Sequence, residues 1–156
     1  MELKTNAINI KNLEFSYGDT KVLKNLNASF EENKFSILLG INGGGKSTLF
    51  KNIIGLLDGY KGNIAIFGKE IKTLSYKDRA PLIGFLPQFH QSVFSFTVEE
   101  VLLTGRIAFS GFGIKNSDRR MALEIMEDLS ILHLKDKVVN QLSGGEQQRV
   151  SIARAI

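Results

Sequence analysis

The chain has 156 residues, with 20 Lys and Arg against 16 Asp and Glu, so its formal net charge is +4. A composition of 43% hydrophobic and 23% charged residues is ordinary for a globular protein and excludes a disordered or fibrous chain. The absence of cysteine excludes disulfides and thiolate sites, and no apolar run approaches the roughly 20 residues of a membrane-spanning helix.

The amino-terminal third predicts a hairpin followed by a buried strand. Apolar residues alternate with polar ones from Ile8 to Tyr17, and the alternation changes parity near Asn12, which predicts a bulge. A second half-buried strand is expected over Val22–Phe30, paired with the first. The apolar run Phe35–Leu39 is typical of a buried parallel strand.

A helical period begins at Ser47 and ends, on the sequence pattern, at Gly59 and Gly62. Its expected apolar face consists of Leu49, Phe50, Ile53, Ile54 and Leu57. Two further strands are expected over residues 64–67 and 82–86, separated by a polar stretch.

The carboxy-terminal half predicts three helices. Thr97 with Glu100 marks the start of a helix over residues 98–106. After a loop at residues 110–116, Asp118 is expected to cap a second helix, and a third runs from about Gly144. The stripe expected on the second helix consists of Met121, Ala122, Ile125, Met126, Leu129 and Leu132. Strands mixed with helices predict an α/β protein with an antiparallel element at its amino-terminal edge.

A glycine-rich loop between the buried strand and the first helix fits the spacing G-x-x-x-x-G-K-[ST]. Glycines let backbone N–H groups turn inward around phosphate oxygens, and the following helix points its positive end at the same anion. In this pattern Lys46 sits on the β- and γ-phosphates and the Ser47 hydroxyl on Mg²⁺. The strand–loop–helix context disfavours a chance match. The expected triphosphate-binding residues are Gly40, Asn42, Gly43, Gly44, Gly45, Lys46, Ser47 and Thr48.

A second motif, Leu142–Glu146 with the sequence LSGGE, is followed by Gln147-Gln148-Arg149. Its serine hydroxyl, two glycines and helix start fit a second anion site. The same residues also fit a plain helix cap, in which Ser143 and Glu146 form a capping box. The position downstream of a phosphate-binding loop favours the anion site.

The two motifs in this order resemble the ATP-binding cassette (ABC) ATPases, whose signature sequence the second motif matches. The resemblance runs from about Leu3 to Ile156 and implies ATP and Mg²⁺ as ligands. It implies a P-loop NTPase core with an N-terminal antiparallel β subdomain over residues 1–86, a Q-loop and helical subdomain over 87–143 and a signature helix over 144–156. We expect these to form one incomplete nucleotide-binding domain.

The resemblance also implies roles for individual residues. Tyr17 matches the position where an aromatic ring stacks on adenine, although a tyrosine at a hairpin edge needs no ligand. Gln88, after Leu86-Pro87, matches the Q-loop glutamine that reaches Mg²⁺ and the attacking water, although a lone loop glutamine is usually solvated. The implied catalytic residues are Lys46 and Gln88, and the implied metal-contacting residues are Ser47 and Gln88. The residues that would face a partner protomer's nucleotide are Ser143, Gly145 and Glu146.

Two features depart from the family pattern. Gly44 stands where the family most often has Ser or another small residue, a mild change. The Walker B strand ending in Asp, the catalytic Glu and the switch His have no counterpart in the 156 residues, so we expect nucleotide binding with little or no hydrolysis. Without that strand the core sheet would expose an apolar edge, which predicts self-association or a domain swap.

The stretch Thr97–Val101, with Gly105-Arg106 and Leu134–Leu142, resembles the ATPase subunits of importers for iron-siderophore, haem or vitamin B12. That resemblance implies a cytoplasmic homodimer, peripheral on the inner face of the membrane, that sandwiches ATP and contacts transmembrane permease subunits through the Q-loop. Residues 1–6 have no apolar signal core, so we expect no secretion.

Two alternative functions remain open from the sequence. One is a soluble ABC ATPase acting on nucleic acid or ribosomes, which the scattered lysines and arginines disfavour, so we expect no nucleic-acid partner. The other is a non-hydrolysing nucleotide-binding or oligomerisation module.

Overall fold

The computed structural model describes residues 6–87, 95–110 and 113–156. The chain divides into two compact units, Met1–Ile83 and Gly84–Ile156. Within the described ranges, no helix combines the length and apolar character that a membrane crossing requires.

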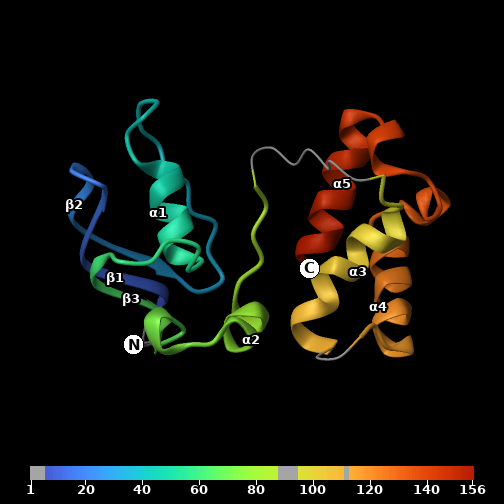
Figure 1. The fold of residues 1–156 in the computed structure, drawn as a ribbon, viewed down its shortest axis with the longest axis horizontal. Helices are drawn as coiled ribbons and strands as arrows, with labels where there is room; N and C mark the ends of the chain where they lie inside the picture. The colour runs from blue at the N-terminus through green and yellow to red at the C-terminus, as the bar shows by residue number, and fades with distance from the viewer. Residues whose placement is uncertain (1–5, 88–94, 111–112) are drawn as a thin grey trace. The chain divides into compact units, whose positions relative to one another are not determined.

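The amino-terminal unit contains an antiparallel sheet with the strand order β2-β1-β3-β4 (Figure 1). The long hairpin of β1 and β2 is confirmed, and so is the irregularity near Asn12: the register shifts between Ile10 and Leu13, and Asn12 has a φ of 50°. The inward-facing residues of β1 and β3, including Ile10, Leu13 and Ile64, are buried. The strand bounds are Asn6–Tyr17 for β1, Thr20–Glu31 for β2, Lys61–Ile66 for β3 and Lys69–Glu70 for β4.

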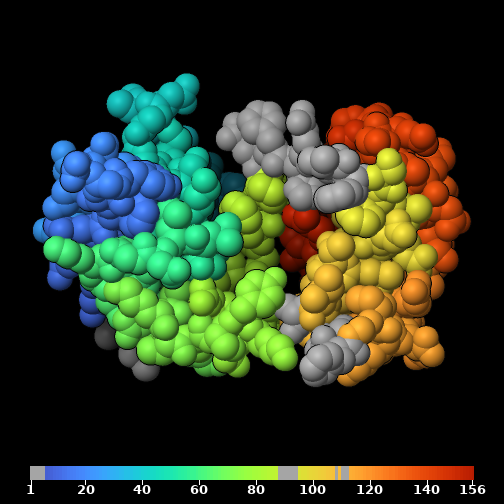
Figure 2. All heavy atoms as spheres, viewed as in Figure 1, coloured from blue at the N-terminus to red at the C-terminus, as the bar shows by residue number. Residues whose placement is uncertain are grey.

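Helix α1 spans Lys46–Ile53 and buries Leu49 and Ile53 in the same core as the sheet. Figures 1 and 2 show the loop before it projecting beyond the strands, in teal. The helix ends earlier than expected, because Gly55, just after the C-cap residue, adopts a φ of 71°. The expectation that Gly59 and Gly62 end this helix was therefore wrong. Short helical turns complete the unit: η1 (Ile71–Thr73), α2 (Tyr76–Arg79) and η2 (Ala80–Leu82).

Two expected strands do not form. Residues 35–39 form no strand, and Phe35 and Leu39 are 92% and 84% exposed. Residues 80–82 form the turn η2, and 83–87 carry no strand assignment. A strand needs a neighbour to bond its backbone groups, and within the described residues no strand pairs with either segment.

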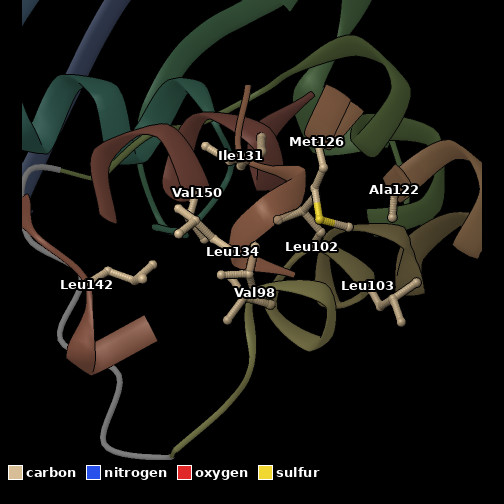
Figure 3. Packing of buried hydrophobic residues seen from close by; sticks show 11 residues of the cluster. Val98, Leu102, Leu103, Ala122, Met126, Ile131, Leu134, Leu142 and Val150 are labelled. Carbon is tan, nitrogen blue, oxygen red and sulfur yellow. The ribbon is translucent and has the colours of Figure 1, made fainter. Parts of the chain in front are cut away.

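The carboxy-terminal unit is helical. Its apolar side chains converge in a single buried cluster built from α3, α4 and α5 and the turns between them (Figure 3). Leu102, Met126 and Val150, one from each helix, are buried in it. The bounds are Val98–Ser110 for α3, Asn116–Asp128 for α4, Leu132–Leu134 for η3, Val139–Gln141 for η4 and Gly144–Ala155 for α5.

The expected helix starts of this unit are largely confirmed. The Glu100 carboxylate accepts the Thr97 N–H at 2.8 Å, while the Thr97 hydroxyl accepts the Glu100 N–H at 3.3 Å. Asp118 is three positions into α4 and is not its first cap: its carboxylate accepts the backbone N–H of Lys115, the N-cap residue. The expected stripe also narrows, since Met121 and Leu132 are more than a third exposed.

Candidate nucleotide-binding site

The loop that enters α1 is shaped by its own backbone. The Gly44 N–H donates to the carbonyl of Ile41 at 3.1 Å, which closes a turn. Gly43 and Gly45 adopt φ angles of 79° and 86°, in the left-handed region where a side chain is strained. The sequence G-x-x-x-x-G-K-S therefore places its glycines where the backbone must reverse direction.

Gly45 is required for a second reason. A Cβ built on it would lie 3.1 Å from a methyl carbon of Leu23 and 3.2 Å from one of Val22, both on strand β2. The loop thus rests directly against the sheet at Gly45. Sequence reasoning missed this support, because alternation along β2 shows which residues face the core and not which loop they contact.

The amino end of α1 is open to an anion. Gly45 is its N-cap residue, no side chain caps the helix, and its first turn contains no acidic residue. The first N–H groups of a helix have no partner within the helix, and its dipole favours a negative charge there. Phosphate oxygens fit this end of the helix, because they accept N–H bonds and no acidic side chain in the first turn repels them.

Lys46 lies folded over the loop. Its Nζ donates to the carbonyls of Gly40 and Ile41, each at 2.7 Å. An ammonium group has three protons, so one remains for an additional acceptor such as a phosphate oxygen. Lys46 therefore holds the loop closed and places a positive charge at its mouth.

The two hydroxyl residues of the first turn differ in exposure. Ser47 is exposed, whereas Thr48 is buried, with 8% of its surface accessible. The Asn52 side chain donates to the Thr48 carbonyl at 2.8 Å, which ties the first two turns of α1 together. Of the two hydroxyls, the one on Ser47 is free to reach a bound metal ion.

Tyr17 ends β1 in the same unit as the loop. Its ring is 47% exposed and meets the Phe15 ring edge-on, with the centroids 4.9 Å apart. Phe15 pairs across the hairpin with Leu23, the residue that supports Gly45. A continuous line of contacts thus connects the Tyr17 ring to the loop, and its exposed ring is available for stacking.

The second motif begins α5. The Ser143 hydroxyl donates to a Glu146 carboxylate oxygen at 2.6 Å, and the Ser143 N–H donates to the same oxygen at 2.8 Å. The Glu146 N–H points back to the serine oxygen, which completes a capping box. An added Cβ at Gly144 or Gly145 would meet open space, so the backbone at these residues is accessible.

The pKa of Glu146 is lowered, chiefly by the side-chain hydrogen bond from Ser143 and then by the backbone one. The positive charges of Lys137 and Arg149 act in the same direction. Glu146 is therefore held as a carboxylate. A phosphate could accept a hydrogen bond from the Ser143 hydroxyl only if that hydroxyl turned away from Glu146.

The expected site residues fall into three groups. Tyr17 and Gly40–Thr48 lie in the amino-terminal unit, while Ser143, Gly145 and Glu146 lie in the carboxy-terminal one. Gln88 is outside the described residues. Gly40–Thr48 surround the amino end of α1, and Ser143, Gly145 and Glu146 lie at the amino end of α5, whereas Tyr17 lies at the end of β1 against Phe15.

Comparison with known proteins shows the family to which the chain belongs. Residues 23–156 match the family model described as ABC transporter. The chain belongs to the ABC transporter family. Its α/β fold is that of ABC ATPases: it superposes on the ADP conformation of an ATP-binding cassette of an ABC transporter with a TM-score of 0.81 and 26% identity, covering 96% of this chain and 64% of that one.

Two similar proteins carry the name of what they transport. The iron(3+)-hydroxamate import ATP-binding protein FhuC of Bacillus subtilis is 34% identical over 97% of this chain and 57% of its own length. The zinc uptake system ATP-binding protein ZurA of Listeria innocua is 37% identical over 96% of this chain and 59% of its own. This ABC-family chain therefore spans a little over half the length of these relatives.

Proposed function

We propose that the chain is the nucleotide-binding part of an ABC transporter's ATP-binding subunit and that it binds MgATP at Gly40–Thr48. One observation carries the proposal: α1 begins uncapped behind a glycine loop, with the Lys46 ammonium at its mouth. The positive helix end, open N–H groups and ammonium together favour a polyphosphate over other ligands.

Each residue of the site has a defined task in this proposal. Backbone N–H groups of Gly43 and of residues 45–48 bind the phosphate oxygens, and Lys46 neutralises the β- and γ-phosphates. The exposed Ser47 hydroxyl holds Mg²⁺, which supplies charge neutralisation at the β- and γ-oxygens. Tyr17 offers its exposed ring to the adenine. Gln88, which lies outside the described residues, is assigned to the metal and the attacking water by its match to the family's Q-loop alone.

Hydrolysis needs a group that orients and deprotonates water, in addition to a phosphate clamp. No residue of the 156 matches the Asp–Glu pair that supplies this group in the family. We therefore propose that residues 1–156 bind nucleotide without appreciable turnover and that the complete subunit hydrolyses it.

The relatives' names support a proposal for the substrate. FhuC is an iron(3+)-hydroxamate import protein, and ZurA belongs to a zinc uptake system. We propose import of a metal-containing substrate, with an iron chelate as the first candidate. A cytoplasmic homodimer would sandwich ATP between Gly40–Thr48 of one copy and Ser143–Glu146 of the other, and would contact permease subunits in the membrane near Gln88.

The test combines equilibrium binding with steady-state turnover of MgATP on the purified chain. The wild type is expected to bind a fluorescent ATP analogue and to show no turnover above background. Lys46→Ala should weaken binding at least tenfold, because it removes the positive charge from the phosphates. Lys51→Ala, an exposed lysine at the far end of α1, is the matched control and should leave binding within about twofold.

Two outcomes would contradict the proposal. Equal binding by wild type and Lys46→Ala would mean that the nucleotide does not use this loop. Turnover that Lys46→Ala abolishes would mean that residues 1–156 already contain a catalytic base, which the proposal denies.

A further inference from the structure

A short ladder of backbone hydrogen bonds connects the start of α3 to the segment before the LSGGE motif. The Val139 N–H donates to the Phe96 carbonyl at 3.0 Å, and the Val98 N–H donates to the Lys137 carbonyl at 3.0 Å. The Glu99 N–H donates to the Lys135 carbonyl at 3.1 Å. Phe96 follows Gln88 by eight positions in the sequence, so the ladder begins close to the Q-loop in the chain.

The segment that carries the ladder is tied to α5 by two further hydrogen bonds. The Leu142 N–H donates to the Val139 carbonyl at 3.2 Å, and the Gln147 side chain donates to the Leu142 carbonyl at 2.9 Å. Leu142 is buried in the helical core. These contacts hold Leu142 in place, and therefore also set the position of Ser143, the next residue.

Glu99 locks this ladder from the side. Its carboxylate lies 3.3 Å from a guanidinium nitrogen of Arg119 on α4 and 3.7 Å from the ammonium of Lys135. The Glu99 side chain is 18% exposed, less than either cation. One half-buried carboxylate thus holds α3, α4 and the segment that leads to the second motif.

The neighbouring acid has a different task. Glu100 turns its carboxylate to the Thr97 N–H and hydroxyl, which caps α3 locally. Glu99 makes no such cap in the described contacts, and its partners lie 20 and 36 positions further along the chain. From the first turn of α3, the Glu99 carboxylate therefore connects segments that are distant in the sequence.

We propose that Glu99 is a positioning residue for the Ser143–Glu146 motif: by clamping Lys135 and Arg119 it fixes the segment before Ser143 to the first turn of α3, and so holds the amino end of α5 in place. This inference rests on the proposed function, which gives the Ser143–Glu146 motif its role. The pairs are partly exposed, so each adds little stability by itself, and the effect is one of placement.

Amide hydrogen exchange on the wild-type chain and its variants tests the placement without nucleotide. Glu99→Ala should speed exchange of the Ser143 and Glu146 amides at least fivefold, while the Val150 amide inside α5 stays within twofold. Glu100→Ala is the matched control: it removes the same charge one residue away and should speed exchange only in the first turn of α3.

Unchanged Ser143 and Glu146 exchange in Glu99→Ala would overturn the inference, and so would an equal rise at Val150, which would signal general loosening. A second readout separates it from the proposed function. ATP-dependent association of the chain, measured by sedimentation, should weaken at least fivefold in Glu99→Ala while binding of the fluorescent analogue is unchanged. If the wild type binds no nucleotide, the proposed function fails, whereas the exchange result still decides the placement.

Discussion

The two units of the chain differ in how completely their apolar residues are buried. In the carboxy-terminal unit, Leu102, Met126 and Val150 meet in one closed cluster. In the amino-terminal unit, Phe35, Ile37 and Leu39 stand in solvent, although their run is just as apolar. A helix satisfies its backbone within itself, whereas a strand depends on a neighbour. The comparison shows that apolar pattern produces burial only where such a neighbour is present.

The largest expected difference in stability is between a leucine buried in the helical cluster and an exposed leucine in the segment before the glycine-rich loop. Leu102→Ala removes a side chain that is 3% exposed and should cost about 2–5 kcal/mol of unfolding free energy. Leu39→Ala, at 84% exposed, should change it by no more than about 0.5 kcal/mol. Urea unfolding followed by far-ultraviolet circular dichroism measures both. Similar losses from the two variants would mean that Leu39 is buried in solution.

Glycines before helices sharpen the comparison. Gly45→Ala forces a side chain into a φ of 86° and against β2, at a cost on the order of 1–3 kcal/mol, and should abolish nucleotide binding. Gly144→Ala meets open space at the start of α5 and should change stability by about 0.5 kcal/mol or less. The measurements are thermal unfolding and analogue binding. Full binding by Gly45→Ala would contradict the described loop.

Helix caps give a smaller contrast. Ser143→Ala removes the hydroxyl of a capping box and should cost about 1 kcal/mol. Ser47→Ala, in an α1 that no side chain caps, should leave stability within about 0.5 kcal/mol while it weakens Mg²⁺-dependent nucleotide binding. A stability loss at Ser47 as large as that at Ser143 would show that its hydroxyl caps α1.

The smallest effect concerns pH. The pKa of Glu146 is lowered in the folded chain, chiefly by the Ser143 hydrogen bond. The carboxylate's contribution is therefore complete above its unfolded pKa of about 4.3 and is lost as the pH falls through the lower folded value. The stability difference between wild type and Glu146→Gln should shrink as the pH falls below about 4. If the stability difference between the two proteins grew on acidification, the pKa of Glu146 would not be lowered in the folded chain.

Local signals in the sequence predicted much of the fold. The hairpin, the start of α1 and the caps at Thr97 and Ser143 depend on residues no more than a few positions apart, and all are confirmed. The strands expected over residues 35–39 and 82–86 failed because pairing is a property of two segments. Sequence pattern shows that a segment is apolar, but it does not name its neighbour.

The candidate site also has a part that the sequence predicted, the motif residues, and a part that it did not, the contacts that support them. Motif spacing alone located the loop at Gly40–Thr48, since the chemistry of a phosphate cradle requires those residues consecutively. The contacts that support it, from Lys46 to the Gly40 carbonyl and from Gly45 to Leu23, arise only on folding. The sequence pattern could not predict the ion pairs of Glu99 either, because Arg119 and Lys135 lie far from it along the chain.

Amide exchange across residues 43–48, with and without MgATP, tests the central claim most directly. If the loop cradles the phosphates through its backbone, MgATP should slow exchange of these amides at least tenfold in the wild type and leave them unchanged in Lys46→Ala. Exchange that MgATP does not alter in the wild type, or alters equally in the variant, would contradict the assignment of the site.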